Sequence, residues 1–268
     1  MESVIKKYVN PKTFIEYLGG SVVRTTESFG SFAIFLAESL KQVFKRPFRR
    51  QLFFQHLEFI GNQSLGIILL TGFFTGAVFG LQLGGIFRIF QAEGMMGGAT
   101  GKALARELAP LMTGFLLSGR AGSAMTAEIA TMKVNEQVDA MEAMAVDPIS
   151  YLVVPRILAF TAMLPFLCSV FIFIGVLGAF FSGVFIFDVD QGIFVEKIVW
   201  LVQPRDIIAG LEKTFVFAII IASISCRYGL EASGGAKGVG VATTMSVVVT
   251  LLSLLGTDFI ITYFQIVW

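Results

Sequence analysis

Five ionisable residues lie inside long apolar stretches of the chain or at their ends, where charge is costly. They are Arg106, Glu107, Glu212, Lys213 and Asp258. Charged side chains at membrane depth normally pair with one another or mark a functional site. Two chemistries are therefore open for this group. The residues form ion pairs that fix the helices in register, or Arg106 and Lys213 bind the phosphate of a lipid headgroup while Glu107 and Asp258 hold them in place.

Two further charges, Arg120 and Glu128, lie deeper in the same apolar stretch as Arg106. They are eight residues apart, so they cannot pair directly on one straight helix. We expect both to tie this stretch to the polar segment that follows it, in a structural and transmitting role.

Composition sets the class of protein. Of 268 residues, 55% are hydrophobic and only 15% are charged, and the mean hydropathy is +0.79. Soluble domains carry about 25% charged residues, so lipid must solvate much of this surface. A disulfide scaffold, a disordered tail and a nucleic-acid binder are excluded. Cys168 and Cys226 are expected to be inert buried thiols, and one histidine, His56, offers neither a metal site nor a triad.

Five apolar stretches are long enough to cross the hydrocarbon core, which takes about 20 helical residues. We therefore expect an all-α integral membrane protein with an interfacial segment over residues 1–58 and a transmembrane domain over 59–268. The predicted spans cover about 60–87, 108–132, 158–187, 207–226 and 239–265.

Orientation follows from the basic residues. Residues 1–58 contain nine Lys/Arg against five Glu, and such an excess stays in the cytoplasm. With five spans the C-terminus is then periplasmic, the loops 88–106 and 188–206 face outward, and 133–156 and 227–238 face inward. The glycine-rich stretch from Gly234 to Gly238 is expected to be a flexible inner loop.

The N-terminal segment is expected to form an amphipathic helix on the inner leaflet, because its apolar residues recur at helical spacing. The basic run from Lys45 to Arg50 would follow it against anionic headgroups. A helix packing on a soluble partner is the alternative. The apolar positions are Phe14, Leu18, Val22, Phe29, Phe32 and Leu36.

Glycine recurs at every fourth residue in the first span, which places four glycines on one helix face. Ordinary close packing within one bundle is one interpretation. A slot for a lipid tail or a second subunit is the other, and it predicts lipid contacts along this face and its borders. The residues concerned are Gly72, Phe73, Gly76, Ala77, Gly80, Leu81 and Gly84.

A polar segment between the second and third spans predicts a short acidic helix over 134–146. Asp147-Pro148 would end it, since the residue before proline leaves the α region. Exposed methionines beside acidic residues suit a groove on a soluble partner, although such helices often only cover the end of a bundle. The partner-facing residues are expected to be Glu136, Gln137, Asp139, Met141, Glu142, Met144, Asp147 and Pro148.

Ten short runs of this chain form a recognisable pattern: 106–110, 118–124, 127–129, 132–134, 136–140, 145–148, 154–156, 228–230, 234–240 and 242–244. They resemble the signature of MlaE/YrbE-type permeases, the transmembrane subunits of ABC systems that move phospholipid between the inner and outer membranes of diderm bacteria. One departure is Leu81-Gln82-Leu83-Gly84, where many relatives read Leu-Gln-Gly-Tyr, so the aromatic at the pocket mouth is absent.

The resemblance implies a homodimer in the inner membrane that maintains outer-membrane lipid asymmetry, with lipid held between the two copies. It implies cytoplasmic ATPase subunits carrying ATP and Mg, a periplasmic ring of Mce-domain subunits and a small STAS-like cytoplasmic accessory. The segment 134–146 becomes the coupling helix, and Arg106, Glu107, Lys213 and Asp258 line the lipid pocket near the periplasm. This chain itself lacks a phosphate-binding Gly-x-x-x-x-Gly-Lys-Ser/Thr loop, so we expect no catalytic residue, metal or cofactor in it.

Two other functions fit the sequence less well. A related permease could carry sterols or other apolar cargo. An intramembrane enzyme would need paired ligands or a nucleophile and base at one depth, and the spans offer only Glu107 and Asp258.

Overall fold

The structure is a computed structural model that describes residues 11–43 and 49–267. In these residues the chain is helical and contains no strand. It divides into two units, residues 1–46 and 47–268. The described residues of the first unit form the helix α2 (Pro11–Val43). The side chains of Phe14, Leu18, Val22 and Phe29 and the segment 44–48 lie outside the described part, so the interfacial role of this helix remains a prediction.

Four helices of the second unit are long and apolar enough to cross a membrane. They are α3 (Arg50–Ile89), α8 (Val154–Ile186) with the π-helical turn Ile149–Val153 in front of it, α10 (Pro204–Leu230) and α11 (Gly235–Val267). Helices α3, α10 and α11 contain the predicted spans 60–87, 207–226 and 239–265 and extend beyond them at both ends, and α8 covers the predicted span 158–187 except for its last residue.

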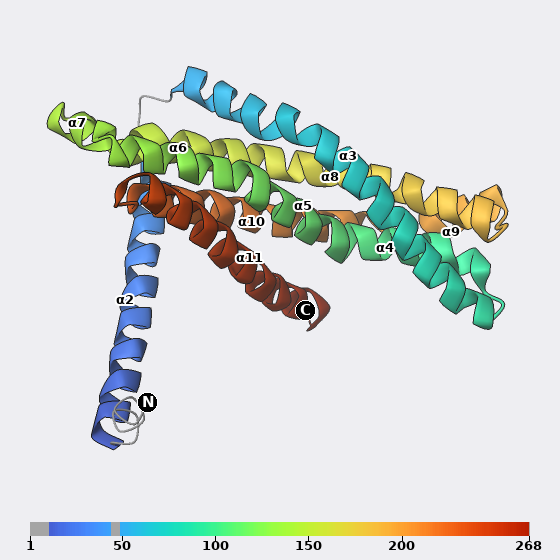
Figure 1. The fold of residues 1–268 in the computed structure, drawn as a ribbon. Coiled ribbons are helices and arrows are strands. Elements are labelled where there is room, and N and C mark those ends of the chain that lie inside the picture. Colours follow the sequence, from blue (N-terminus) through green and yellow to red (C-terminus); the bar gives the residue numbers. More distant parts are fainter. Residues whose placement is uncertain (1–10, 44–48, 268) are drawn as a thin grey trace. The chain divides into compact units, whose positions relative to one another are not determined.

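The predicted span 108–132 is not one regular helix. Helices α4 (Met96–Ala103), α5 (Ala109–Leu117) and α6 (Ser123–Val134) are joined by π-helical turns at Leu104–Leu108 and Ser118–Gly122. Figure 1 shows the three helices following one path through the bundle. The helical path from Met96 to Val134 contains six charged residues, and it is not among the four helices of the described residues that are long and apolar enough to span a membrane. A fifth span therefore remains a prediction.

Small residues determine how α3 packs on α8. A Cβ atom on Gly76 would overlap the carbonyl oxygen of Gly175, and one on Gly178 would overlap that of Phe73. The two backbones therefore cross in direct contact. Figure 1 shows α3 lying across α8.

Short helices connect the long ones at the two ends of the bundle. A turn with Glu136 at φ 59° leads from α6 into α7 (Gln137–Ala143). At the other end, the 3-10 turn Glu93–Met95 precedes α4, and α9 (Gln191–Leu201) packs on α4 through Gly97 and Gly98.

The glycine-rich stretch predicted as a loop is mostly helical. Helix α10 ends at Leu230 and α11 begins at Gly235, so only residues 231–234 connect them. Gly234 and Gly235 have φ angles of 87° and 68°, which favour glycine at this reversal.

Candidate functional site

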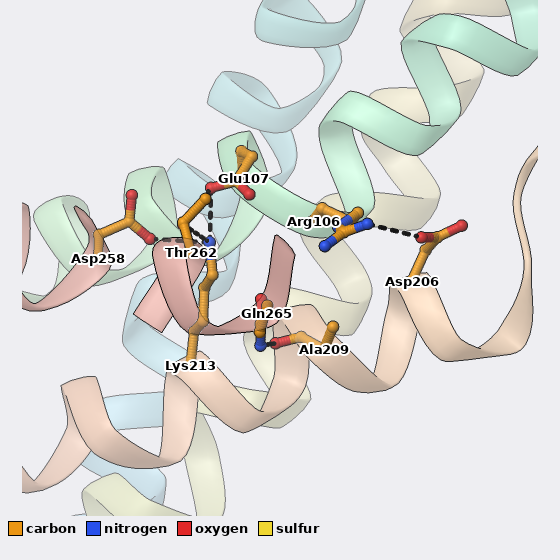
Figure 2. A network of polar contacts seen from close by, with 8 residues as sticks. All are labelled: Arg106, Glu107, Asp206, Ala209, Lys213, Asp258, Thr262 and Gln265. Carbon is orange, nitrogen blue, oxygen red and sulfur yellow. Dashed lines mark hydrogen bonds and ion pairs between the residues drawn. The ribbon is translucent and has the colours of Figure 1, made fainter. Parts of the chain in front are cut away.

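Lys213 is the centre of a closed cluster of charges. Its side chain is fully buried, and its Nζ lies 2.5 Å from Glu107 Oε2, 2.7 Å from Thr262 Oγ1 and 3.1 Å from Asp258 Oδ1. Glu107 comes from the π-helical turn before α5, Lys213 from α10 and Asp258 from α11. Figure 2 shows Lys213 reaching between the two carboxylates.

Most of the bonding capacity of the ammonium group is used within the chain. A lysine has three N–H donors. Two of them donate to Glu107 Oε2 and Thr262 Oγ1, and Asp258 Oδ1 lies at ion-pair distance without receiving a hydrogen bond. Of the two interpretations open for Lys213, this geometry favours the ion pair that fixes α10 and α11 in register over the direct lipid ligand.

Arg106 extends away from this cluster toward Asp206, as Figure 2 shows. Arg106 NH1 lies 3.5 Å from Asp206 Oδ1, and Lys102 Nζ lies 3.7 Å from Asp206 Oδ2. Hydrogen bonds of this kind measure about 2.7–3.2 Å, so both pairs are loose. Asp206 instead bonds the N–H of Gln203 at 2.9 Å and caps α10. Among the described residues Arg106 has no hydrogen-bond partner, so its donors remain free.

The loose pairs border a recess of about 420 Å³ between α4, α10 and the end of α11, which we call the Asp206 recess. Three cations face two carboxylates here, so the local charge is positive. Gln265 donates to Ala209 O at 3.0 Å, while its own buried Oε1 has no donor. The lining residues are Lys102, Arg106, Gln203, Arg205, Asp206, Ile208, Ala209, Glu212, Gln265 and Ile266.

Sequence reasoning missed Asp206, Lys102 and Arg205 as members of this site. It placed Glu212 with the Lys213 cluster, whereas the structure places Glu212 on the recess. A usable signal was present: Gln203 and Asp206 bracket Pro204 with the spacing of a helix start, and both their side chains complete a capping box.

The glycine face of α3 is closed by α8 of the same chain, so the slot hypothesis for it is wrong. Gly72, Gly76, Gly80 and Gly84 are all buried. A Cβ atom would meet Phe171 at Gly72, Gly175 at Gly76, Ser182 at Gly80 and Phe187 at Gly84. Lipid cannot touch this face while α8 covers it. Of the bordering residues, Phe73 and Ala77 are half-buried, and Leu81 is exposed.

We expected Arg120 and Glu128 to connect their helical stretch to the polar segment, but the structure places their bonds elsewhere. Arg120 bonds α3 instead, through Phe59 O at 2.7 Å, Ser64 Oγ at 2.9 Å and Gln63 Oε1. Glu128 bonds Arg156 of α8 at 2.9 Å. Eight residues turn a helix by about 80° beyond two full turns, so the two charges face different neighbours.

Helix α7 presents acidic residues and a methionine to solvent at one end of the bundle. Glu136, Gln137, Asp139, Glu142, Met144 and Asp147 are exposed, Met141 is half-buried, and Pro148 is buried. The predicted helix over 134–146 is shorter, because Glu136 and Ala145 adopt left-handed φ angles. The helix ends at Ala143, before Asp147 and Pro148 are reached, so these two residues do not set its end. Pro148 is thus not part of the exposed surface, and Asp139 is paired with Lys133 at 2.5 Å.

No group of three or more His, Cys, Asp or Glu residues that could hold a metal ion occurs in the described part of the chain. The one carboxylate pair at similar depth, Glu107 and Asp258, is bound to Lys213.

These features define a multi-pass helical membrane protein with charged sites at the ends of its helices. Residues 53–264 match the family model described as "Permease MlaE". The chain therefore belongs to the MlaE permease family, whose members are transporter subunits.

The relatives carry consistent names. A "Probable ABC transporter permease protein" of Rickettsia felis is 38% identical over 245 residues, 91% of this chain and 95% of the relative. A protein of the same description from Synechocystis is 40% identical over 209 residues, 78% of this chain and 80% of the relative. The Arabidopsis thaliana protein "TRIGALACTOSYLDIACYLGLYCEROL 1, chloroplastic" is 37% identical over 210 residues, 78% of this chain and 60% of the relative.

Proposed function

We propose that this chain is the permease subunit of an ABC transporter that moves phospholipid between the inner and outer membranes of a Gram-negative bacterium. Two copies would hold the lipid between them, and a partner ATPase would drive the movement. The observation that carries the cargo assignment is the Asp206 recess, where cations with free donors lie beside apolar side chains at the end of a helical bundle.

The recess has the two kinds of surface that a phospholipid needs. The Arg106 guanidinium suits a phosphate, because its planar fork can donate two parallel hydrogen bonds. Lys102 and Arg205 add positive charge on either side. Ile208 and Ile266 line the same recess and are 54% and 71% exposed, so they offer an apolar path for acyl chains.

The proposed arrangement in the membrane has five spans, with the path from Met96 to Val134 as the second. The N-terminus is cytoplasmic and the C-terminus periplasmic in the inner membrane. Helix α7 then faces the cytoplasm and seats on the ATPase, to which the relatives' name as ABC permeases points. The Asp206 recess faces the periplasm, where a ring of Mce-domain subunits would receive lipid. A STAS-like accessory completes the proposed complex.

The Arabidopsis relative bears the name of a galactolipid, which supports a lipid as cargo for this family. Sterols are the second candidate cargo. They carry no phosphate and would leave the cations of the Asp206 recess unused, so the free donors of Arg106 favour phospholipid. An intramembrane enzyme would need to free Glu107 or Asp258 from Lys213 first.

The experiment is lipid extraction from the purified permease–ATPase complex followed by mass spectrometry, with wild type and Arg106→Gln compared. Bound phospholipid in the wild type and less in the variant is the expected result. Sterols or free fatty acids alone would overturn the assignment. Lipid turnover by the isolated chain, without nucleotide or partner, would support the enzyme instead.

A further inference from the structure

An ion pair not used by the proposed lipid site joins the two helices on either side of the polar segment. Arg156, in the first turn of α8, is 1% exposed. Its NH2 lies 2.9 Å from Glu128 Oε2 of α6, and its NH1 donates to Leu152 O at 2.7 Å. The guanidinium therefore points back along α8 toward the polar segment, the direction in which helical side chains lean.

The Glu128–Arg156 pair joins the two ends of the loop that connects α6 to α8, and we call this pair the neck of the loop. Helix α6 ends at Val134, six residues after Glu128, and α8 begins at Val154, two residues before Arg156. The intervening chain contains α7 and the π-helical turn Ile149–Val153. Among the described residues between Glu128 and Arg156, Lys133 and Asp139 form the only other ion pair, and both belong to the first half of this segment.

The two partners differ in how firmly they are held. The side chain of Arg156 is 2% exposed and that of Glu128 is 54% exposed. The buried Nε of Arg156 has no acceptor, and among the described residues Glu128 is the only charged partner of this guanidinium. A buried charge without a partner is strongly unfavourable, which opposes any separation of α6 from α8. Helix α10 packs on both α6 and α8.

We infer that Glu128 and Arg156 are positioning residues that make α6 and α8 move as one body when a partner displaces α7. This inference rests on the proposed function, because it assigns α7 the seat of the ATPase. Without the neck, force on α7 would spread the loop open. With the neck intact, the displacement reaches two elements together: the helical path Met96–Val134, which includes Arg106 and Glu107, and α8, which packs on α3.

The test measures lipid transferred per ATP hydrolysed in vesicles that contain the reconstituted permease–ATPase complex. Glu128→Gln removes the charge but keeps a side-chain oxygen that can accept from Arg156, so the buried guanidinium retains a hydrogen-bond partner and the protein should fold. We expect ATP hydrolysis to continue while lipid transferred per ATP falls at least about fivefold, the lower end of typical coupling between sites. The double variant Glu128→Arg/Arg156→Glu should recover coupling, which a loss of packing alone would not allow.

Glu231→Gln is the matched control. Glu231 is a half-exposed carboxylate at the same end of the bundle, and its partner Arg227 lies 2.8 Å away on the same helix. Its loss removes an ion pair without releasing one helix from another, and coupling should not change. Wild-type coupling in Glu128→Gln, or an equal loss in Glu231→Gln, would overturn the inference.

A second measurement separates this inference from the proposed function. Spin labels at the exposed positions Thr131 of α6 and Ala162 of α8, with Cys168 and Cys226 replaced by alanine, report the width of the neck. We expect one narrow distance distribution in the otherwise unchanged chain and a broader one with Glu128→Gln. Equal distributions would refute the inference even if the complex transports lipid. If wild type transfers no phospholipid but the distributions differ as expected, the proposed function fails and the neck stands.

Discussion

Two neighbouring groups of charges in this bundle are bonded in opposite ways. Around Lys213, two carboxylates and a hydroxyl lie within 3.1 Å of one buried ammonium. Around Asp206, two cations stay at 3.5 and 3.7 Å and line a recess of about 420 Å³. Arg106 and Glu107 are adjacent in the sequence, yet they belong to different groups.

The difference teaches that charge at membrane depth has two separate uses in one protein. A charge whose bonds are all made within the chain contributes to the register of helices, and a ligand would have to break those bonds. A charge with free donors beside a recess can bind something else. The two groups therefore predict opposite results when a cation is removed.

The largest effect is expected for Lys213→Met. It would leave the partly exposed Glu107 and the mostly buried Asp258 side by side without their cation. Losing one partner of a fully buried pair costs about 3–5 kcal/mol, which is an upper bound here. We expect a strongly lowered thermal unfolding midpoint of the purified chain in detergent. The triple variant Glu107→Gln/Lys213→Met/Asp258→Asn should recover most of the loss, since it leaves no unpaired charge. A stable Lys213→Met protein that binds no lipid would instead make Lys213 a ligand.

The contact between the glycine face of α3 and α8 involves no charge, and its contribution to stability can be measured by substitution. Gly76→Ala places a methyl group on the Gly175 carbonyl of α8, and overpacking of this kind costs about 1–3 kcal/mol. The control is Gly85→Ala, which meets open space and should gain up to about 1 kcal/mol of helix stability. Expression and unfolding temperature are the measurements. If Gly76→Ala were as stable as Gly85→Ala, α3 and α8 would not be in direct contact.

Apolar run length was enough to predict four of the helices. The bounds were short because residues such as Arg50 and Gln51 continue α3 beyond its apolar part. Run length could not reveal the π-helical turns at Leu104–Leu108 and Ser118–Gly122, which depend on packing against neighbours. It also could not assign partners across helices. Sequence placed Arg106, Glu107 and Lys213 at one level, but the direction in which each side chain points decides that Glu107 meets Lys213 and Arg106 meets Asp206.

The group of charges around Asp206 is tested by Arg106→Gln and Arg205→Gln. Neither cation is buried, so the change in stability should stay within about 0.5 kcal/mol. A lost hydrogen bond to a charged group costs about 1.5–3 kcal/mol, or roughly 10- to 100-fold in affinity. We expect co-purified phospholipid to fall by a factor in this range for Arg106→Gln, and by less for the more exposed Arg205→Gln. Lys41→Gln on α2, outside the recess, should change neither quantity. Undiminished phospholipid in Arg106→Gln would show that the recess is not the headgroup site.

The smallest effect on the stability of the chain is expected for changes at the acidic surface of α7. Its acidic side chains differ as the two groups above do, because Asp139 is already paired with Lys133 while Glu136 and Glu142 are exposed. Charge reversal at Glu136 and Glu142 to lysine should therefore leave the unfolding temperature nearly unchanged, since exposed charges contribute at most about 1 kcal/mol. It should reduce the amount of ATPase that co-purifies by about tenfold or more, because like charges across an interface are strongly unfavourable. The matched control is Glu196→Lys on α9, an equally exposed carboxylate at the opposite end of the bundle, and it should retain the ATPase. If the double reversal retained the partner at wild-type level, the unpaired acids of α7 would be a solvated surface, and the ATPase would have to seat elsewhere on the chain.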